Sequence, residues 1–206
     1  MSAGLFRPRD PDSVYSEANL ITLFRVAASM TFFALAIIHQ SPTYNYIGFG
    51  IHWVVDFIDG FCARTLKQET VVGAEIDLIA DRLELICFYV IFLHFRPQLV
   101  LPAMLYLVDY AFVDFYLGYQ FTKFDIISPN YFHKVNRTVY RLNFSPVGKF
   151  ANSSVVTLTL IFLPGLWLLV SVYALGLIVV KSYSVYLVER EKARRRRGGP
   201  APGTAG

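Results

Sequence analysis

The stretch DFIDGFCARTLKQETVVGAEIDLIAD, residues 56–81, places four aspartates in and beside two strongly apolar segments. They are Asp56, Asp59, Asp77 and Asp81. Ionised carboxylates repel one another, and each loses hydration energy when it is taken out of water. The fold around this stretch must therefore supply something that neutralises these groups.

The rest of the chain is also apolar. Of its 206 residues, 55% are hydrophobic and 17% are charged. Apolar runs of about 18 or more residues predict transmembrane helices, so we expect an all-α, polytopic membrane protein with six transmembrane helices. The predicted spans are residues 20–39, 46–64, 74–95, 99–121, 147–163 and 166–187. The membrane domain would cover residues 18–188, between a polar or interfacial lead (1–17) and a basic, disordered tail (189–206).

The placement of Lys and Arg predicts the orientation of these spans. If the N-terminus is cytoplasmic, Arg96 is the only Lys or Arg residue in the outer loops. The inner segments then contain most of the other basic residues. Because cytoplasmic loops are enriched in Lys and Arg, both termini are expected in the cytoplasm. The protein is then a multi-pass protein of the cell membrane.

The spacing of the aspartates predicts that they meet. Asp56 and Asp59 are three apart, and Asp77 and Asp81 are four apart, so each pair shares a helical face. The connection between the two helices is short, which makes them antiparallel neighbours. Protonation could neutralise the cluster; so could two Mg²⁺ or Mn²⁺ ions, which prefer oxygen ligands. An isolated carboxylate in a span is often half of an ion pair, but four at these intervals favour a functional site.

Small residues accompany the aspartates. Gly60, Ala63 and Gly73 leave room for a flat or bulky group to approach the helix backbone. Arg64 beside them is suited to a phosphate. The stretch contains no zinc, P-loop or dinucleotide-binding motif.

Written as D-x2-D-G-x2-A-R-x8-G-x3-D-x3-D, the stretch resembles the signature of the CDP-alcohol phosphotransferases, with every fixed position filled. The segment ANLITLFR, residues 18–25, is similar to the Pro-Asn-x-x-Thr-x-x-Arg pattern of that family, with Ala18 in place of Pro. The resemblance implies a membrane enzyme of phospholipid biosynthesis. It would transfer a phosphatidyl group from CDP-diacylglycerol to the hydroxyl of an alcohol acceptor and release CMP.

The resemblance also implies roles for individual residues. Asp56, Asp59, Asp77 and Asp81 would bind the two metal ions, and Asp81 could instead act as the general base. Nucleotide binding would fall to Gly60, Ala63, Arg64 and Gly73. The active site would face the cytoplasm. Members of the family are often homodimers, and no nucleic-acid partner is expected.

The acceptor is less clearly specified, and a glycerol-phosphate or phosphatidylglycerol type and an inositol type both remain open. Arg137, Arg141 and Lys149 could bind an anionic acceptor, although the positive-inside bias alone also explains them. Asp109 resembles the Leu-Asp of phosphatidylinositol synthases. Asp109 and Asp114 are five apart and are not expected to share a helical face closely.

One alternative from another class is an ion-coupled transporter whose carboxylates bind a cation. The position of the aspartates at span ends favours the enzyme. Glu84 lies one turn beyond Asp81 on the same face. It could support the site or pair with a neighbouring helix through Arg25.

Overall fold

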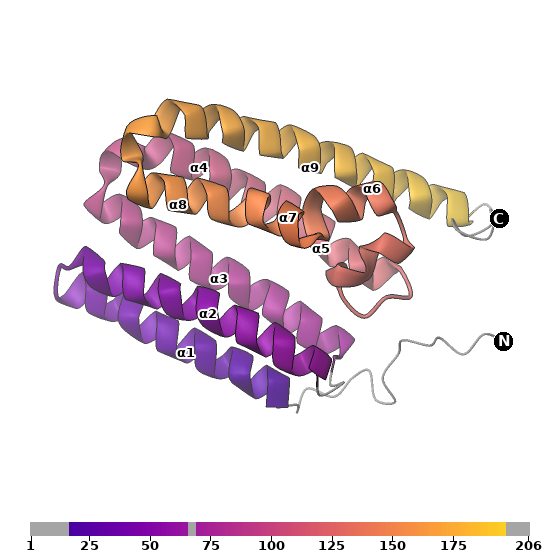
Figure 1. Cartoon of the computed structure of the whole chain (residues 1–206), viewed down its shortest axis with the longest axis horizontal. Coiled ribbons are helices and arrows are strands. Elements are labelled where there is room, and N and C mark those ends of the chain that lie inside the picture. Colours follow the sequence, from indigo (N-terminus) through magenta and orange to yellow (C-terminus); the bar gives the residue numbers. More distant parts are fainter. Residues whose placement is uncertain (1–16, 66–68, 197–206) are drawn as a thin grey trace. The chain divides into compact units, whose positions relative to one another are not determined.

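The computed structural model describes residues 17–65 and 69–196 (Figure 1). The side chains of residues 17–18, 59 and 61–64 lie outside this description. The described residues are helical with short connections and contain no strand, which confirms the all-α prediction. The chain divides into two compact units, residues 1–100 and 101–206, which are described separately below.

The part of the first unit that the structure describes contains three long helices. Helices α1 (Glu17–Ile38), α2 (Pro42–Thr65) and α3 (Val71–Phe95) run alongside one another and pack together (Figure 1). A tight turn joins α1 to α2, in which Gln40 adopts a left-handed φ of 49°, a common way to end a helix. Pro42 then opens α2, where its fixed φ suits the first helical turn.

Helix α1 buries polar side chains and exposes apolar ones, which is the reverse of the pattern in a water-soluble protein. Arg25 and Ser29 are both 0% exposed, whereas Leu23 and Phe24 are 65% and 67% exposed. In lipid, apolar side chains are well solvated, and polar groups must find partners inside the protein. This pattern therefore fits a helix surrounded by hydrocarbon.

Within the described residues, the second unit is built from several short helical pieces followed by one long helix. They are α4 (Val100–Val108), a π-helix (Asp109–Asp114), α5 (Phe115–Tyr119), 3-10 turns (Gln120–Lys123 and Pro129–Lys134), α6 (Arg137–Val139), a π-helix (Tyr140–Phe144), α7 (Pro146–Lys149), a π-helix (Phe150–Ser154), α8 (Val155–Phe162) and α9 (Trp167–Arg196). Two further 3-10 turns, Pro97–Leu99 and Pro164–Leu166, precede α4 and α9. Proline opens several of these pieces, because its missing N–H costs nothing there.

The π-helix at Asp109–Asp114 corrects the prediction for its two aspartates. Lys181 of α9 lies 2.6 Å from Asp109 and 3.1 Å from Asp114. A π-helix pairs backbone groups five residues apart, so residues five apart lie closer to one face than they would on an α-helix. Both carboxylates thus reach the same buried lysine, which α-helical spacing had not predicted.

The prediction of a disordered tail is also wrong for the first part of the tail. Helix α9 continues to Arg196, and it is stabilised by contacts one turn apart, Glu189–Lys192 at 2.9 Å and Glu191–Arg195 at 3.4 Å. The three arginines of its last turn also complement the helix dipole. Residues 197–206 and most of the predicted lead lie outside the described residues.

Helices occupy all six predicted spans. Within the described residues, three helical segments are long and apolar enough to cross a membrane: Asn19–Ile38, Pro97–Lys123 and Pro164–Arg196. The six predicted spans are thus helical. Three of these segments are candidates to cross a membrane by their length and composition, and the six-span arrangement stays a prediction.

The buried lysine predicts a measurable effect. Lys181→Met should lower the free energy of unfolding by about 3–5 kcal/mol, because it leaves buried carboxylates without their cation. The triple variant Lys181→Met/Asp109→Asn/Asp114→Asn should recover much of this loss. Thermal unfolding in detergent measures both variants.

The control is Glu189→Gln, which removes a partly exposed ion pair with Lys192 and should cost less than about 1 kcal/mol. Equal losses for Lys181→Met and Glu189→Gln would contradict the importance of the buried cluster.

Candidate active site

Three of the four motif aspartates lie together in the first unit. One carboxylate oxygen from each of Asp56, Asp77 and Asp81 lies within 4.8 Å of the other two. Asp56 lies in the second half of α2, and the other two lie one turn apart in the first half of α3. Because the helices are antiparallel, these two segments meet. The predicted convergence is confirmed for these three; the Asp59 side chain lies outside the described residues.

A buried arginine lies against the three aspartates. Arg25 of α1 has a fully buried side chain, and its Nη1 lies 2.5 Å from Asp56. Its Nη2 lies 2.8 Å from Asp81 and 3.2 Å from Asp77. The guanidinium is always charged in proteins. Arg25 therefore provides a fixed positive charge on one side of the cluster.

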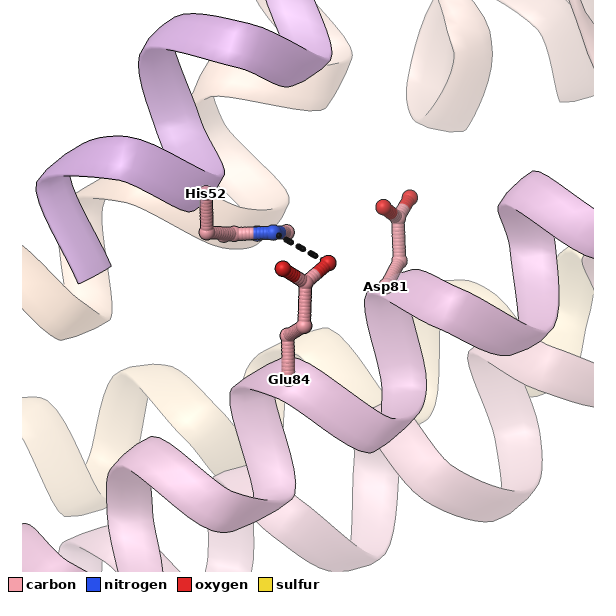
Figure 2. Close-up of side chains that lie close together, drawn as sticks. All are labelled: His52, Asp81 and Glu84. Carbon is pink, nitrogen blue, oxygen red and sulfur yellow. Dashed lines mark hydrogen bonds and ion pairs between the residues drawn. The ribbon is translucent and has the colours of Figure 1, made fainter. Parts of the chain in front are cut away.

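The other edge of this guanidinium faces Glu84. Arg25 Nε lies 3.1 Å from Glu84 Oε2, and both side chains are 0% exposed. This contact confirms that Glu84 pairs with Arg25. Glu84 is in turn held by His52 of α2, whose Nδ1 lies 3.0 Å away, and by the hydroxyl of Ser29 of α1. Figure 2 shows His52 facing Glu84, with Asp81 one turn along the same helix.

Burial changes across the site. The side chains of Asp56 and Asp77 are 40% and 41% exposed, and that of Asp81 is 23% exposed, whereas Arg25 and Glu84 are completely buried. The aspartates thus form the accessible side of the cluster. Several carboxylate oxygens at short mutual distances are suitable ligands for Mg²⁺ or Mn²⁺. The donor set therefore fits divalent cations.

The residues predicted to bind the nucleotide are only partly described. Gly60 lies in α2, beyond the aspartates, while the side chains of Ala63 and Arg64 lie outside the described residues. Gly73 lies in the first turn of α3. Its backbone N–H donates a hydrogen bond to Thr70 Oγ1 at 2.9 Å, and Thr70 thereby caps the helix. A Cβ at Gly73 would lie 2.7 Å from Asn19 Oδ1 and 2.8 Å from Thr70 Oγ1. This close approach gives Gly73 a packing role, whether or not it contacts a nucleotide.

The residues predicted to bind the acceptor belong to the second unit. Arg137, Arg141 and Lys149 are exposed, and Lys149 Nζ donates a hydrogen bond to Asn130 at 2.7 Å. Asp109 is 0% exposed and contacts Lys181. A carboxylate in this buried ion pair is poorly placed to contact an acceptor.

Comparison with known proteins agrees with the motif. The profile of the CDP-alcohol phosphatidyltransferase family matches residues 15–180. The chain belongs to this family. No solved structure was found to match the chain.

Curated relatives in the family differ in the acceptor that their names state. A CDP-diacylglycerol--glycerol-3-phosphate 3-phosphatidyltransferase of Cereibacter sphaeroides is 31% identical over 106 residues, covering 48% of each chain. The enzyme of the same name from Haemophilus influenzae is 32% identical, over 41% of this chain and 48% of the relative. A probable CDP-diacylglycerol--inositol 3-phosphatidyltransferase 2 of Arabidopsis thaliana is 29% identical, over 42% of this chain and 38% of the relative. The chain thus spans about half the length of the curated relatives it matches, or less.

Two residues that contact Glu84 lie outside the family signature. Ser29 and His52, which hold Glu84, were not predicted as site residues. A helical spacing of four separates Ser29 from Arg25 and His52 from Asp56, which places each pair on one face. Polar residues one turn from an intramembrane charge were the signal that could have identified them.

The close contact at Gly73 predicts that a larger residue there destabilises the protein. Gly73→Ala should lower the free energy of unfolding by about 1–3 kcal/mol, because the new methyl group would have to displace Asn19 or the capping Thr70. Thermal unfolding in detergent measures the change.

Gly50→Ala in α2 is the matched control. A Cβ there meets nothing within 4 Å, so the substitution should be neutral or stabilise by about 0.5–1 kcal/mol through helix propensity. If Gly73→Ala were tolerated as well as Gly50→Ala, the packing role of Gly73 would be refuted.

Proposed function

We propose that the protein transfers a phosphatidyl group from CDP-diacylglycerol to the hydroxyl of an alcohol acceptor and releases CMP. The acceptor oxygen would bond to the lipid-linked phosphorus of the pyrophosphate. The bond from that phosphorus to the bridging oxygen would break, and CMP would leave with that oxygen. The single observation that carries this proposal is the meeting of Asp56, Asp77 and Asp81 in one partly exposed cluster.

In this proposal, the aspartates hold two Mg²⁺ or Mn²⁺ ions, with Asp59 as the fourth ligand residue. Bound divalent ions would offset negative charge on the phosphate oxygens during transfer. Asp81 is the candidate general base, because a carboxylate near the acceptor hydroxyl can remove its proton. Its contact with Arg25 at 2.8 Å would hold it in position. Gly60, Ala63, Arg64 and Gly73 remain the proposed nucleotide site.

The proposed setting is a six-span membrane domain, residues 18–188, with both termini in the cytoplasm. The basic residues of the inner segments support this orientation. The site would then face the cytoplasm at the membrane surface. CDP and the acceptor could approach from water while the acyl chains of the substrate remain in lipid.

For the acceptor, a glycerol-phosphate type comes first, because two of the three relatives described above are named for glycerol 3-phosphate. The exposed Arg137, Arg141 and Lys149 are candidates to bind its phosphate. An inositol-type acceptor is the second candidate, and the name of the plant relative supports it. The match to the family leaves the transporter alternative without support.

Purified protein in lipid vesicles with radiolabelled CDP-diacylglycerol tests the proposal. CMP release should require Mg²⁺ or Mn²⁺, stop with EDTA, and depend on one member of a panel containing glycerol 3-phosphate, phosphatidylglycerol and inositol. Asp81→Asn should lower kcat by about 10²–10⁴-fold.

The control is Asp125→Asn, which removes an exposed carboxylate outside the cluster and should leave turnover unchanged. CMP release that persists in EDTA, or that survives Asp81→Asn, would refute the assigned roles.

A further inference from the structure

Arg25 makes an unusual set of contacts for a residue of an apolar helix. Its guanidinium faces four carboxylates on two other helices, at distances of 2.5–3.2 Å. Three of the four are the partly exposed aspartates of the candidate metal site. An arginine fully out of water is costly unless it is paired, so this arrangement requires a compensating role.

Glu84, His52 and Ser29 fix the arginine from the buried side. Glu84 Oε2 lies between Arg25 Nε at 3.1 Å and His52 Nδ1 at 3.0 Å. The Ser29 hydroxyl contacts Glu84 Oε1 and lies 2.5 Å from the backbone carbonyl of Arg25. Each helix of the unit thus contributes to one network, and Figure 2 shows its His52–Glu84 contact beside Asp81.

The charges suggest why both Arg25 and Glu84 are present. Arg25 carries one positive charge, which opposes the entry of further cations, and the buried Glu84 carries one compensating negative charge. The negative charge of the motif aspartates is then available to divalent ions. Without Glu84, Arg25 would weaken cation binding; without Arg25, the aspartates would repel one another whenever cations are scarce.

We propose that Arg25 is a built-in counter-cation of the aspartate cluster, positioned by Glu84, His52 and Ser29. It holds the three helices together when divalent ions are removed, and it limits the affinity of the cluster for them. Arg25 and Glu84 are positioning residues that act through the aspartates. This inference rests on the metal site of the proposed function.

Thermal unfolding of the full chain in detergent, with EDTA or with saturating Mn²⁺, tests the stabilising role. In EDTA, Arg25→Met should lower the unfolding temperature by about 5 °C or more. Saturating Mn²⁺ should restore the part of this loss that comes from repulsion among the aspartates, because bound ions stabilise the folded state by mass action. Arg25→Lys keeps the charge and should show a smaller loss in EDTA.

Lys181→Met is the matched control, because it also removes a buried cation that faces two carboxylates. Its loss of stability should be the same in EDTA and in Mn²⁺. If Arg25→Met behaved in the same way, with a loss that Mn²⁺ does not repair, the role of Arg25 would be structural only and the inference would be overturned.

Mn²⁺ affinity, measured by electron paramagnetic resonance of the free ion, tests the second role without any turnover. Arg25→Met or Arg25→Lys separates the charge from the shape of the side chain. Arg25→Met should tighten Mn²⁺ binding about tenfold, Arg25→Lys should change it less, and Glu84→Gln should weaken it about tenfold. Unchanged affinity in Arg25→Met and Glu84→Gln would overturn the inference.

A double-mutant cycle in EDTA distinguishes coupling from separate effects. Glu84→Gln should destabilise the wild type but stabilise the Arg25→Met variant, where Glu84 would be a buried charge without its cation. Additive losses would contradict the coupling. If the wild type bound no Mn²⁺ at all, the proposed metal site itself would be refuted. If Mn²⁺ bound with an affinity that does not depend on Arg25, only this inference would be refuted.

Discussion

The first unit depends on the neutralisation of carboxylates that α2 and α3 bring together in an apolar setting. Asp56, Asp77 and Asp81 lie close enough for strong mutual repulsion. Arg25 reaches all three from α1, so the contact that neutralises them also joins the three helices. The position of the candidate active site and the packing of this unit therefore have one electrostatic origin.

In both units, a buried basic side chain neutralises carboxylates from another helix, but the helical geometry differs. In the first, Asp77 and Asp81, four residues apart, align on one face of the α-helix α3. In the second, a π-helix lets Asp109 and Asp114 approach Lys181 together. The first cluster is partly exposed and suits ligands, whereas Asp109 and Lys181 are completely buried. Exposure thus separates a candidate site from an internal ion pair, although the residue types are similar.

Much of this could be predicted from sequence because helical spacing is regular. The intervals between the aspartates and the short connection correctly predicted that Asp56 on α2 meets Asp77 and Asp81 on α3. The pairing of Glu84 with Arg25 was one of the two roles expected for a carboxylate on the face of Asp81, and the structure contains that contact. The same regularity failed at Asp109–Asp114, because a π-helix gives no clear sequence signal and α-helical spacing was assumed.

Other features depend on three-dimensional packing that one sequence does not encode locally. The spacing of His52 and Ser29 marks them as neighbours of charged residues, but their shared contact with Glu84 arises only from the packing of three helices. The tail was expected to be disordered because of its charge and glycine content, but its glutamates and basic residues are spaced to pair along a continuing helix. Gly73 was assigned to a nucleotide, yet its contact with Asn19 gives it a packing role as well.

The most direct test of the central claim is a crystal structure of the protein with Mn²⁺ and CDP-diacylglycerol, using anomalous scattering to locate the metal. The account predicts two manganese peaks among Asp56, Asp77 and Asp81, with the pyrophosphate of the lipid bound to both ions. Manganese found elsewhere, or a pyrophosphate bound away from these aspartates, would contradict it.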